Sequence, residues 1–224
     1  MPAKKGARTK AKEPRWRRRK DERRPEILAA AMDVFAARGF AAARLDEVAA
    51  RAGITKGTLY LYFDNKEALF KAIVHEQLLP RLAEASERVS QHTGPVTTLL
   101  LEVIVTVANA VIGTRLGLIP KLVIADAGNF PELARFYVDE VIARGMSVFT
   151  RILERGVAQG EFRNIDIALA APVCIGPLLL LAIWKNVLEP HAKRKIDRDQ
   201  YIATYTDVIL RGLLAPGVEL PWKA

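Results

Sequence analysis

The chain has 224 residues, of which 50% are hydrophobic and 26% charged, a composition that excludes disorder throughout and is sufficient for a sizeable core. The formal net charge of +9 lies within residues 1–24, where twelve lysines and arginines accompany three acidic residues, while the other 200 residues carry 22 charges of each sign. A negatively charged partner is therefore expected, and it meets the amino-terminal segment.

Cysteine content and hydropathy indicate where the protein works. Cys174 is the only cysteine, so no internal disulfide can form, and we expect a small buried apolar role for it rather than oxidant sensing. No apolar segment follows the basic amino terminus within reach of a signal peptide, so we expect a cytoplasmic protein. Residues 167–184 are uncharged, but they are barely long enough to span a membrane and contain two prolines, so a buried helix is expected there.

The first part of the chain shows an arm followed by three short helical patterns. Residues 1–24 are too charged to form a core, and we expect a disordered arm. A first helix begins with Pro25 in its first turn and ends at Gly39. A second, shorter stripe stops at Gly53, and Thr55 caps a third helix; the apolar residues of these two helices are Leu45, Val48, Ala49, Ala52, Leu59 and Phe63.

The rest of the chain continues the helical pattern. Asp64 and Glu67 form a capping box that starts a fourth helix near Asn65, and this helix runs toward Ser90 with a kink at Pro80. Further helices are expected at 96–113, 116–127, 131–157, 166–187 and 198–213. Because no stretch alternates in the manner of a strand, the sequence predicts an all-α fold of about nine helices. The expected domains are residues 1–24, 25–70 and 71–224.

The second and third helices together have the character of a helix-turn-helix. Such a pair projects the start of its last helix into the major groove of DNA, which is about 12 Å wide. Lys56 and Thr58 supply hydrogen-bond donors there, and Gly57 allows the backbone to approach closely. Tyr60 can hold a phosphate through its hydroxyl while its ring stays packed, and Tyr62 and Lys66 extend the same surface.

Each of these residues also has an ordinary explanation when taken alone. Lysines are usually solvated, tyrosines are usually half-buried packing residues, and Thr55 could be only a helix cap. Their joint placement on a short third helix, beside a basic arm, favours a DNA-binding surface.

Residues 25–70, PEILAAAMDVFAARGFAAARLDEVAARAGITKGTLYLYFDNKEALF, resemble the DNA-binding domain of the TetR/AcrR family of tetracycline-repressor-like regulators. The motif A-G-I-T-K-G-T-L-Y-x-Y-F followed by N-K-E-A-L-F is close to the usual family sequence. Beyond these 46 residues the similarity is weaker and includes the segment IADAGNFPELARFY. The resemblance implies that Lys56, Gly57 and Thr58 face bases, while Thr55, Tyr60, Tyr62 and Lys66 mostly touch the DNA backbone.

Two positions depart from the family pattern. Ala43 and Arg44 stand where the family usually has a Thr or Ser pair that caps the second helix. Arg44 can replace the lost hydroxyl contact with a phosphate clamp, although its charge opposes the helix dipole. Leu61 stands at a position that is commonly polar or aromatic; it either contacts a thymine methyl group or has no role, and both alternatives stay open.

The resemblance further implies a homodimeric repressor whose larger domain encloses a small-molecule effector pocket and which binds a near-palindromic double-stranded DNA operator. Candidate pocket residues combine rings with isolated polar groups in apolar segments: Asn109, Asp126, Phe130, Tyr137 and Trp184. The last helix and the apolar segment before it are candidates for a four-helix dimer interface through Leu178, Ala182, Tyr201, Tyr205, Val208, Ile209 and Leu213. The basic arm either reaches along a minor groove or is a solvated tail that raises nonspecific affinity.

Two other classes of function fit the sequence less well. An enzyme has little support, because His75, His92 and His191 lie far apart without metal-ligand spacing and the chain has neither a P-loop nor a dinucleotide fingerprint. We therefore expect no catalytic residues, no metal and no cofactor. The remaining alternative is a cationic helical protein that binds anionic membranes or DNA nonspecifically; we expect no membrane partner.

Overall fold

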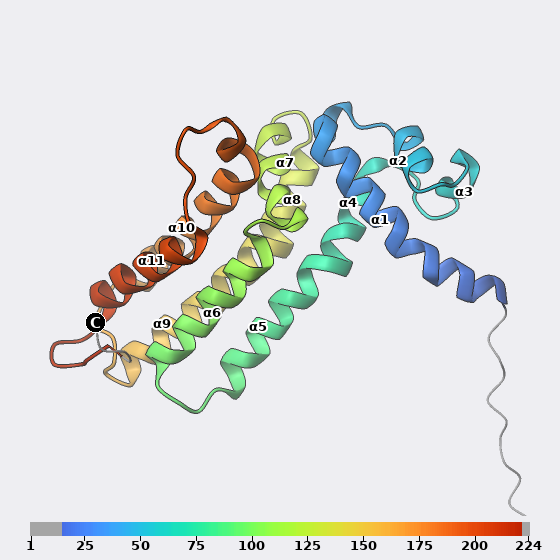
Figure 1. The fold of residues 1–224 in the computed structure, drawn as a ribbon. Coiled ribbons are helices and arrows are strands. Elements are labelled where there is room, and N and C mark those ends of the chain that lie inside the picture. The colour runs from blue at the N-terminus through green and yellow to red at the C-terminus, as the bar shows by residue number, and fades with distance from the viewer. Residues whose placement is uncertain (1–14, 221–224) are drawn as a thin grey trace, which may run out of the picture.

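The computed structural model of the chain describes residues 15–220, with side chains from residue 23 onward. Its regular elements are helices (Figure 1), and one isolated antiparallel bridge joins Phe162 to Leu214. Where short π- and 3₁₀-helical segments join consecutive α-helices, the described chain forms nine continuous helical stretches. The expected all-α fold of about nine helices is confirmed.

The amino-terminal helix is longer than expected. α1 (Arg15–Ala42) begins ten residues before Pro25, which lies inside it, so the expected start at Pro25 and the expected disorder of residues 15–24 are wrong. The reason is that charge prevents a segment from forming a core but not a helix, and Arg, Lys and Glu are strong helix formers. The remainder of the expected arm, residues 1–14, lies outside the described residues.

Two glycines set the geometry of the helix-turn-helix. Gly39 interrupts the helical geometry of α1 with a φ of 76°, and Gly53 makes the turn between α2 (Leu45–Arg51) and α3 (Lys56–Tyr60) with a φ of 64°. Positive φ strains residues that carry a Cβ atom, which explains glycine at both places. The end of the first helix at Gly39 and the turn at Gly53 are as predicted.

A long bent helix leads from the amino-terminal helices into the larger domain (Figure 1). It consists of α4 (Lys66–Ile73), the π-helical segment η1 (Val74–Leu78) and α5 (Leu79–Gln91). Its N-cap is Asn65, whose Oδ1 accepts a hydrogen bond of 2.7 Å from the N–H of Ala68, so the cap lies one residue after the predicted Asp64. The irregularity expected at Pro80 is the π-helical turn just before it, because proline lacks the N–H of a regular helix.

The larger domain is a bundle in which α9 (Ala143–Ala158) packs against α5, α6 (Val96–Val111) and α10 (Ile167–Ile183). α9 continues from α8 (Pro131–Tyr137) through η3 (Val138–Ile142), as one stretch where one helix was expected. The remaining elements are η2 (Arg115–Leu118), α7 (Ile119–Asp126), η4 (Trp184–Leu188), η5 (Glu189–His191) and α11 (Arg198–Leu213).

The hydrophobic core has two parts, and one of them crosses the expected domain boundary after residue 70. The rings of Phe35, Phe40 and Phe70 pack together at centroid distances of 5.4 to 6.3 Å. The same cluster includes Leu122 of α7 and Leu133 of α8. A second cluster lies inside the bundle. α7 and α8 therefore share a close-packed core with α1 and α4.

The helix Ile167–His191 is long and apolar enough to cross a membrane by length and composition alone, and 28% of its apolar window is buried in the protomer. The stretches Val96–Val111 and Arg115–Asp126 pass the same test only together and are bent by 83°. Residues of Ile167–His191 and Val96–Val111 pack partly into the cluster inside the bundle, and residues of Arg115–Asp126 pack into the cluster shared with the amino-terminal helices.

Candidate DNA-binding surface and effector cavity

α3 presents its first residues to solvent and its apolar residues to the core. Thr55, Lys56 and Gly57 are exposed, whereas Leu59 is fully buried and Phe63 is 4% exposed. Burial of a leucine side chain contributes about 1.5–3 kcal/mol, which fastens α3 to the domain. The helix therefore has the outward orientation that major-groove contact requires.

Thr55 caps α3 as predicted and is also positioned by its neighbour. Its Oγ1 accepts a hydrogen bond of 3.2 Å from the N–H of Thr58, and the two hydroxyl groups lie 2.9 Å apart within hydrogen-bonding distance. The two threonines thus form one polar unit at the exposed start of the helix.

Lys56 has a partner that the sequence did not reveal. Its Nζ lies 2.9 Å from Oδ1 of Asp46, in the first turn of α2, and 5.9 Å from the centre of the Tyr60 ring. The hydrogen bond between the two side chains raises the pKa of Lys56 and lowers the pKa of Asp46. Both side chains remain largely exposed, at 59% for Lys56 and 46% for Asp46. The pair therefore lies on the surface that α3 presents.

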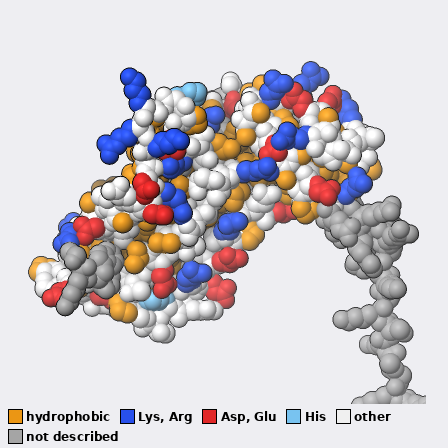
Figure 2. All heavy atoms as spheres, in the orientation of Figure 1, with side chains coloured by type: hydrophobic (Ala, Val, Ile, Leu, Met, Phe, Trp, Pro, Cys, Tyr) orange, Lys and Arg blue, Asp and Glu red, His pale blue; other side chains and the backbone are white. Residues whose placement is uncertain are grey.

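The other residues expected to touch the DNA backbone lie at the start of α2 and at the end of α3. Arg44 is exposed and is the N-cap residue of α2, where its side chain makes no capping bond. Tyr60 is 45% and Leu61 is 75% exposed, while Tyr62 is half-buried with its ring stacked 6.4 Å from that of Phe63. Figure 2 shows lysine and arginine side chains spread over the end of the molecule that carries α2 and α3.

Lys66 is placed differently from the expectation. Its Nζ donates hydrogen bonds to the carbonyl oxygens of Phe40, at 2.9 Å, and Ala41, at 2.6 Å. It also lies 5.0 Å from the centre of the Phe40 ring and 4.9 Å from that of Phe130. The ammonium group is thus engaged between the two domains, and a phosphate contact for it stays a prediction.

Asp126 and Phe130, which the sequence predicts as effector-pocket residues, take part in this contact. Oδ2 of Asp126, which is 8% exposed, accepts a hydrogen bond of 3.2 Å from the N–H of Ala41. The Phe130 ring meets the Phe40 ring edge to face at 5.0 Å. We refer to Phe40, Ala41, Lys66, Asp126 and Phe130 as the domain joint. The sequence did not reveal it, because residues from three distant segments meet there.

An apolar cavity of about 370 Å³ lies between α5, α6, α7, the α8–η3–α9 stretch and α10. Of the predicted pocket residues only Tyr137 lines it, and burial raises the pKa of Tyr137 to about 12. Its hydroxyl is therefore neutral and available as a hydrogen-bond donor or acceptor. Three other lining residues are well exposed, Ile124 at 69%, Val138 at 49% and Ile142 at 45%. They give the cavity an apolar mouth.

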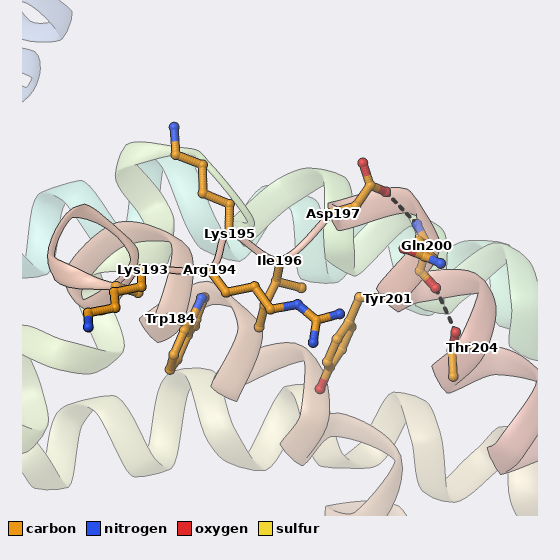
Figure 3. Close-up of a pocket in the computed structure, with 10 residues that line it drawn as sticks. Trp184, Lys193, Arg194, Lys195, Ile196, Asp197, Gln200, Tyr201 and Thr204 are labelled. Carbon is orange, nitrogen blue, oxygen red and sulfur yellow. Dashed lines mark hydrogen bonds between the residues drawn. The ribbon is translucent and has the colours of Figure 1, made fainter.

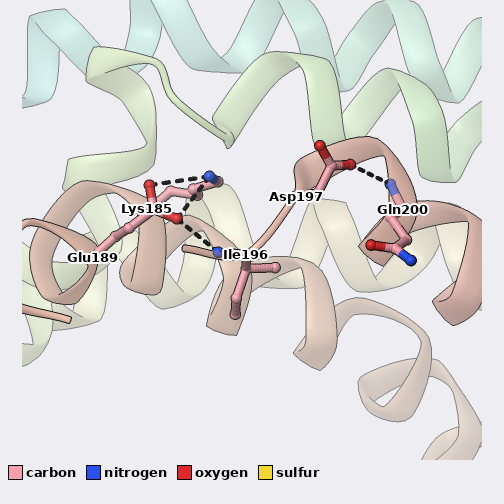
Figure 4. A network of polar contacts seen from close by, with 5 residues as sticks. All are labelled: Lys185, Glu189, Ile196, Asp197 and Gln200. Carbon is pink, nitrogen blue, oxygen red and sulfur yellow. Dashed lines mark hydrogen bonds and ion pairs between the residues drawn. The ribbon is translucent and has the colours of Figure 1, made fainter. Parts of the chain in front are cut away.

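Trp184 lines a different cavity, of about 640 Å³, beside the loop that precedes α11 (Figure 3). There the rings of Trp184 and Tyr201 lie on either side of the Arg194 side chain. The loop is held by Glu189, which pairs with Lys185 at 2.7 Å and accepts a hydrogen bond of 3.0 Å from the N–H of Ile196 (Figure 4).

Asn109 lies apart from both cavities just described, in a groove between α6 and α11, where it accepts a hydrogen bond from Arg198. The five predicted pocket residues therefore do not form one site. Their shared feature, a polar or aromatic group within an apolar segment, does not specify which helix face they occupy.

The predicted dimer residues divide in a similar way. Leu178, Ala182, Tyr205 and Leu213 are at most 8% exposed and pack into the protomer's own core, so the protomer does not present them on its surface. Tyr201 and Ile209 are half-buried. The exposed apolar residues of the same two helices are Leu169, Val173, Leu180 and Val208. A helix that is apolar on every side gives no sequence signal for which side faces outward.

Among the residues that the structure describes, no group of three or more His, Cys, Asp and Glu side chains is placed to hold a metal ion. Cys174 is buried, as predicted, and its burial raises its pKa to about 11.

Comparison with known proteins covers both domains. A family model of bacterial regulatory proteins of the tetR family matches residues 27–73. A model of the C-terminal domain of AefR-like transcriptional repressors matches residues 98–212, a little over half of the chain. The HTH-type transcriptional repressor KstR2 of Rhodococcus jostii is 28% identical over 199 residues, which cover 88% of this chain and 94% of that protein.

Solved structures have the same fold. The transcriptional regulator FadR from Bacillus subtilis, in complex with stearoyl-CoA, has a TM-score of 0.71 at 22% identity and covers 84% of this chain and 98% of its own. The ketosteroid transcriptional regulator KstR2 of Mycobacterium tuberculosis has a TM-score of 0.68 at 22% identity, with 86% and 95% covered. The family models match both domains, and the exposure of α3 is consistent with the DNA-binding function of the matched families. The chain belongs to the tetR family of bacterial regulatory proteins and is a DNA-binding transcriptional regulator.

Proposed function

We propose that this protein is a cytoplasmic repressor that binds a near-palindromic operator as a homodimer and leaves it when an apolar small molecule fills the cavity between α5 and α10. The observation that carries this proposal is the position of the cavity: its wall includes residues of α7 and α8, and the segment that links these two helices contacts the DNA-binding domain at the domain joint. On this proposal the protein acts by binding and has no catalytic residues.

On the DNA side, Lys56, Gly57 and Thr58 face base edges from the exposed start of α3. Thr55 and Tyr60 hold the backbone beside them, and Arg44 and Tyr62 extend this contact. Exposure of the first turn of α3 supports the proposal, because a buried turn has no access to the groove.

The cavity wall indicates the chemical class of the effector. It is lined almost entirely by aliphatic and aromatic side chains, with the hydroxyl of Tyr137 as its polar group, so it favours an aliphatic chain or a fused ring system with one polar atom. The structural relatives include a regulator with bound stearoyl-CoA and a ketosteroid regulator. We infer a long-chain acyl thioester, with the chain inside and the polar head outside the mouth formed by Ile124, Val138 and Ile142.

The domain joint offers a route for release. Val123 and Ala127 of the α7 end, and Ala134 and Tyr137 of α8, line the cavity on either side of Asp126 and Phe130 in the chain. Interiors are close-packed, so a ligand that widens the cavity shifts these helices rather than compressing them. The shift moves Asp126 and Phe130 relative to Phe40, and the DNA-binding domain turns away from the spacing that the operator needs.

Dimer formation uses the exposed apolar residues of the last two long helices. Leu169, Val173 and Leu180 lie on α10 and Val208 on α11. Two such helices from each protomer form a four-helix interface, which covers the apolar surface of Ile167–His191 without a membrane. The two-fold axis then sets two α3 helices about 34–36 Å apart, one turn of DNA.

The test is selection of bound duplexes from a random pool at fixed salt, followed by titration of the operator complex with acyl-CoA thioesters of increasing chain length. We expect a near-palindromic consensus and release that strengthens with chain length until the cavity is full. Enrichment of no sequence would favour the cationic, nonspecific alternative. A thioester that binds the protein and leaves the operator complex intact would overturn the release mechanism.

A further inference from the structure

A carboxylate lies on the surface that faces DNA, where phosphate repulsion disfavours it. Asp46 is 46% exposed and its Oδ1 lies 2.9 Å from Nζ of Lys56, the first residue of α3. DNA carries one phosphate charge per about 1.7 Å of its axis, so a surface built only for electrostatic attraction would have no acid at this place. The position of Asp46 therefore calls for an explanation beyond affinity.

Helix stability does not supply that explanation. α2 carries two acids in its first turn, Asp46 and Glu47, and either one complements the helix dipole. Glu47 turns toward α1 and pairs with Arg38 at 3.2 Å, so it connects the first two helices of the domain. Asp46 instead spans the turn to α3 and occupies the cation that is best placed to contact bases.

We propose that Asp46 is a specificity-determining residue: it holds the Lys56 ammonium and releases it only to a base acceptor in the major groove. This inference rests on the proposed function of α3 as the recognition helix. On unrelated DNA Lys56 stays with Asp46, and the pair, having no net charge, neutralises no phosphate. On the operator Lys56 turns to an acceptor such as O6 or N7 of guanine, the commonest specific lysine contact.

Release of Lys56 at the operator leaves Asp46 in a position where solvent can replace its partner, because nearly half of its side chain is already exposed. The carboxylate can also accept a hydrogen bond from N4 of cytosine. A guanine–cytosine pair therefore suits both members of the ion pair, and the operator is expected to have one beneath Lys56 in each half-site.

The experiment uses the full chain with Asp46→Asn. Dissociation constants are measured at several salt concentrations for the selected operator and for a duplex of the same length without it. Removal of the carboxylate frees Lys56 for phosphates, so affinity for the unrelated duplex should rise by about three- to tenfold and its salt slope should steepen by about one. Operator affinity should change less, so the ratio of the two constants falls.

Glu132→Gln is the matched control. Glu132 also lies in the first turn of a seven-residue helix and pairs with an arginine, Arg135, at 2.8 Å, but it belongs to α8. The substitution Glu132→Gln removes one negative charge, as Asp46→Asn does, and it should leave both dissociation constants unchanged. Asp46→Ser removes the same carboxylate with a residue suited to helix starts, and it serves as a second variant if Asp46→Asn folds poorly.

Equal shifts for operator and unrelated DNA, which leave the ratio of the two constants unchanged in both Asp46 variants, would overturn the inference and leave the proposed function standing. If the unaltered protein shows no preference for any sequence, the proposed function itself fails. Measurements on the unaltered chain therefore distinguish the two failures.

Discussion

Phe40 in the DNA-binding domain and Phe130 before α8 meet edge to face, with ring centroids 5.0 Å apart. Lys66 lies over both rings, and Asp126 holds the adjoining backbone of Ala41. A contact between aromatic rings is worth about 0.5–1.5 kcal/mol beyond burial. The joint thus fixes the Phe40 end of the DNA-binding domain against the segment that links α7 to α8.

Asp126→Ala should uncouple the effector from DNA. The substitution leaves the part-buried N–H of Ala41 without its acceptor, which costs about 1–3 kcal/mol. The effector should still bind, but release of the operator should need at least about tenfold more of it. Fluorescence anisotropy of labelled operator, with calorimetry for effector binding, measures both quantities. Asp126→Asn keeps an acceptor oxygen and should respond nearly as the unaltered protein does.

Lys66 and Arg44 should differ in how they act on DNA binding. Lys66 is bonded to two carbonyls, so Lys66→Met should lower the free energy of unfolding by about 1.5–3 kcal/mol and change the salt slope little. Arg44 is exposed, and Arg44→Gln should reduce the slope by about one without affecting stability. Urea unfolding measures the effect on stability, and operator affinity at four salt concentrations measures the salt slope. If Lys66→Met changed the salt slope as much as Arg44→Gln does, Lys66 would contact a phosphate.

A larger side chain at position 145 should lock the protein on DNA. Gly145 lines the cavity, and a Cβ atom built there meets only Ile175 and Leu82, at 3.8 and 4.0 Å. Gly145→Leu should therefore fill the space of the effector, leave operator affinity within about threefold, and abolish release. Gly145→Ala leaves most of the cavity open and serves as the control. Full release of Gly145→Leu by a thioester would place the effector elsewhere.

The Thr55 cap should support both stability and recognition. Thr55→Ala removes the acceptor for the N–H of Thr58, and loss of such a cap costs about 0.5–2 kcal/mol. Thr55→Ser keeps the hydroxyl and should retain most of the stability. Thermal unfolding of the three proteins measures the effect. Equal midpoints for Thr55→Ala and the unaltered chain would mean that the bond contributes nothing.

Cys174 should make the protein less stable in alkali. Burial raises the thiol pKa from 9.0 to about 11, so between these values the unfolded chain loses a proton that the folded chain keeps. The contribution of Cys174 to the free energy of unfolding is fully present below pH 9. It falls as the pH rises toward 11, by about 2 kcal/mol at pH 10.5. Urea unfolding at pH 8 and 10.5 should show this loss for the unaltered protein in excess of that for Cys174→Ala. The comparison cancels the contribution of Tyr137, whose pKa burial also raises. The pKa of Tyr205 is raised by burial and also by Cys174, so the part that Cys174 causes belongs to the measured difference.

The sequence by itself determined the helices and the exposed motif. α11 was predicted at 198–213 and lies there, and Thr55 caps α3 as its position implied. These features depend on apolar spacing, caps and glycines within a few residues of one another, and such local signals are present in the chain before it folds. The same signals failed at Pro25, because the helix-forming tendency of Arg, Lys and Glu does not depend on apolar spacing.

Only the tertiary structure decided which side chains meet. Asp46 and Lys56 are joined across a turn, and Ala41 finds Asp126 in a segment 85 residues away. The outward faces of α10 and α11 were likewise hidden, because Leu178 and Leu180 are equally apolar and only packing buries the first and exposes the second. Which side chains meet depends on where whole helices lie. That position results from the packing of the entire core and not from any local sequence pattern.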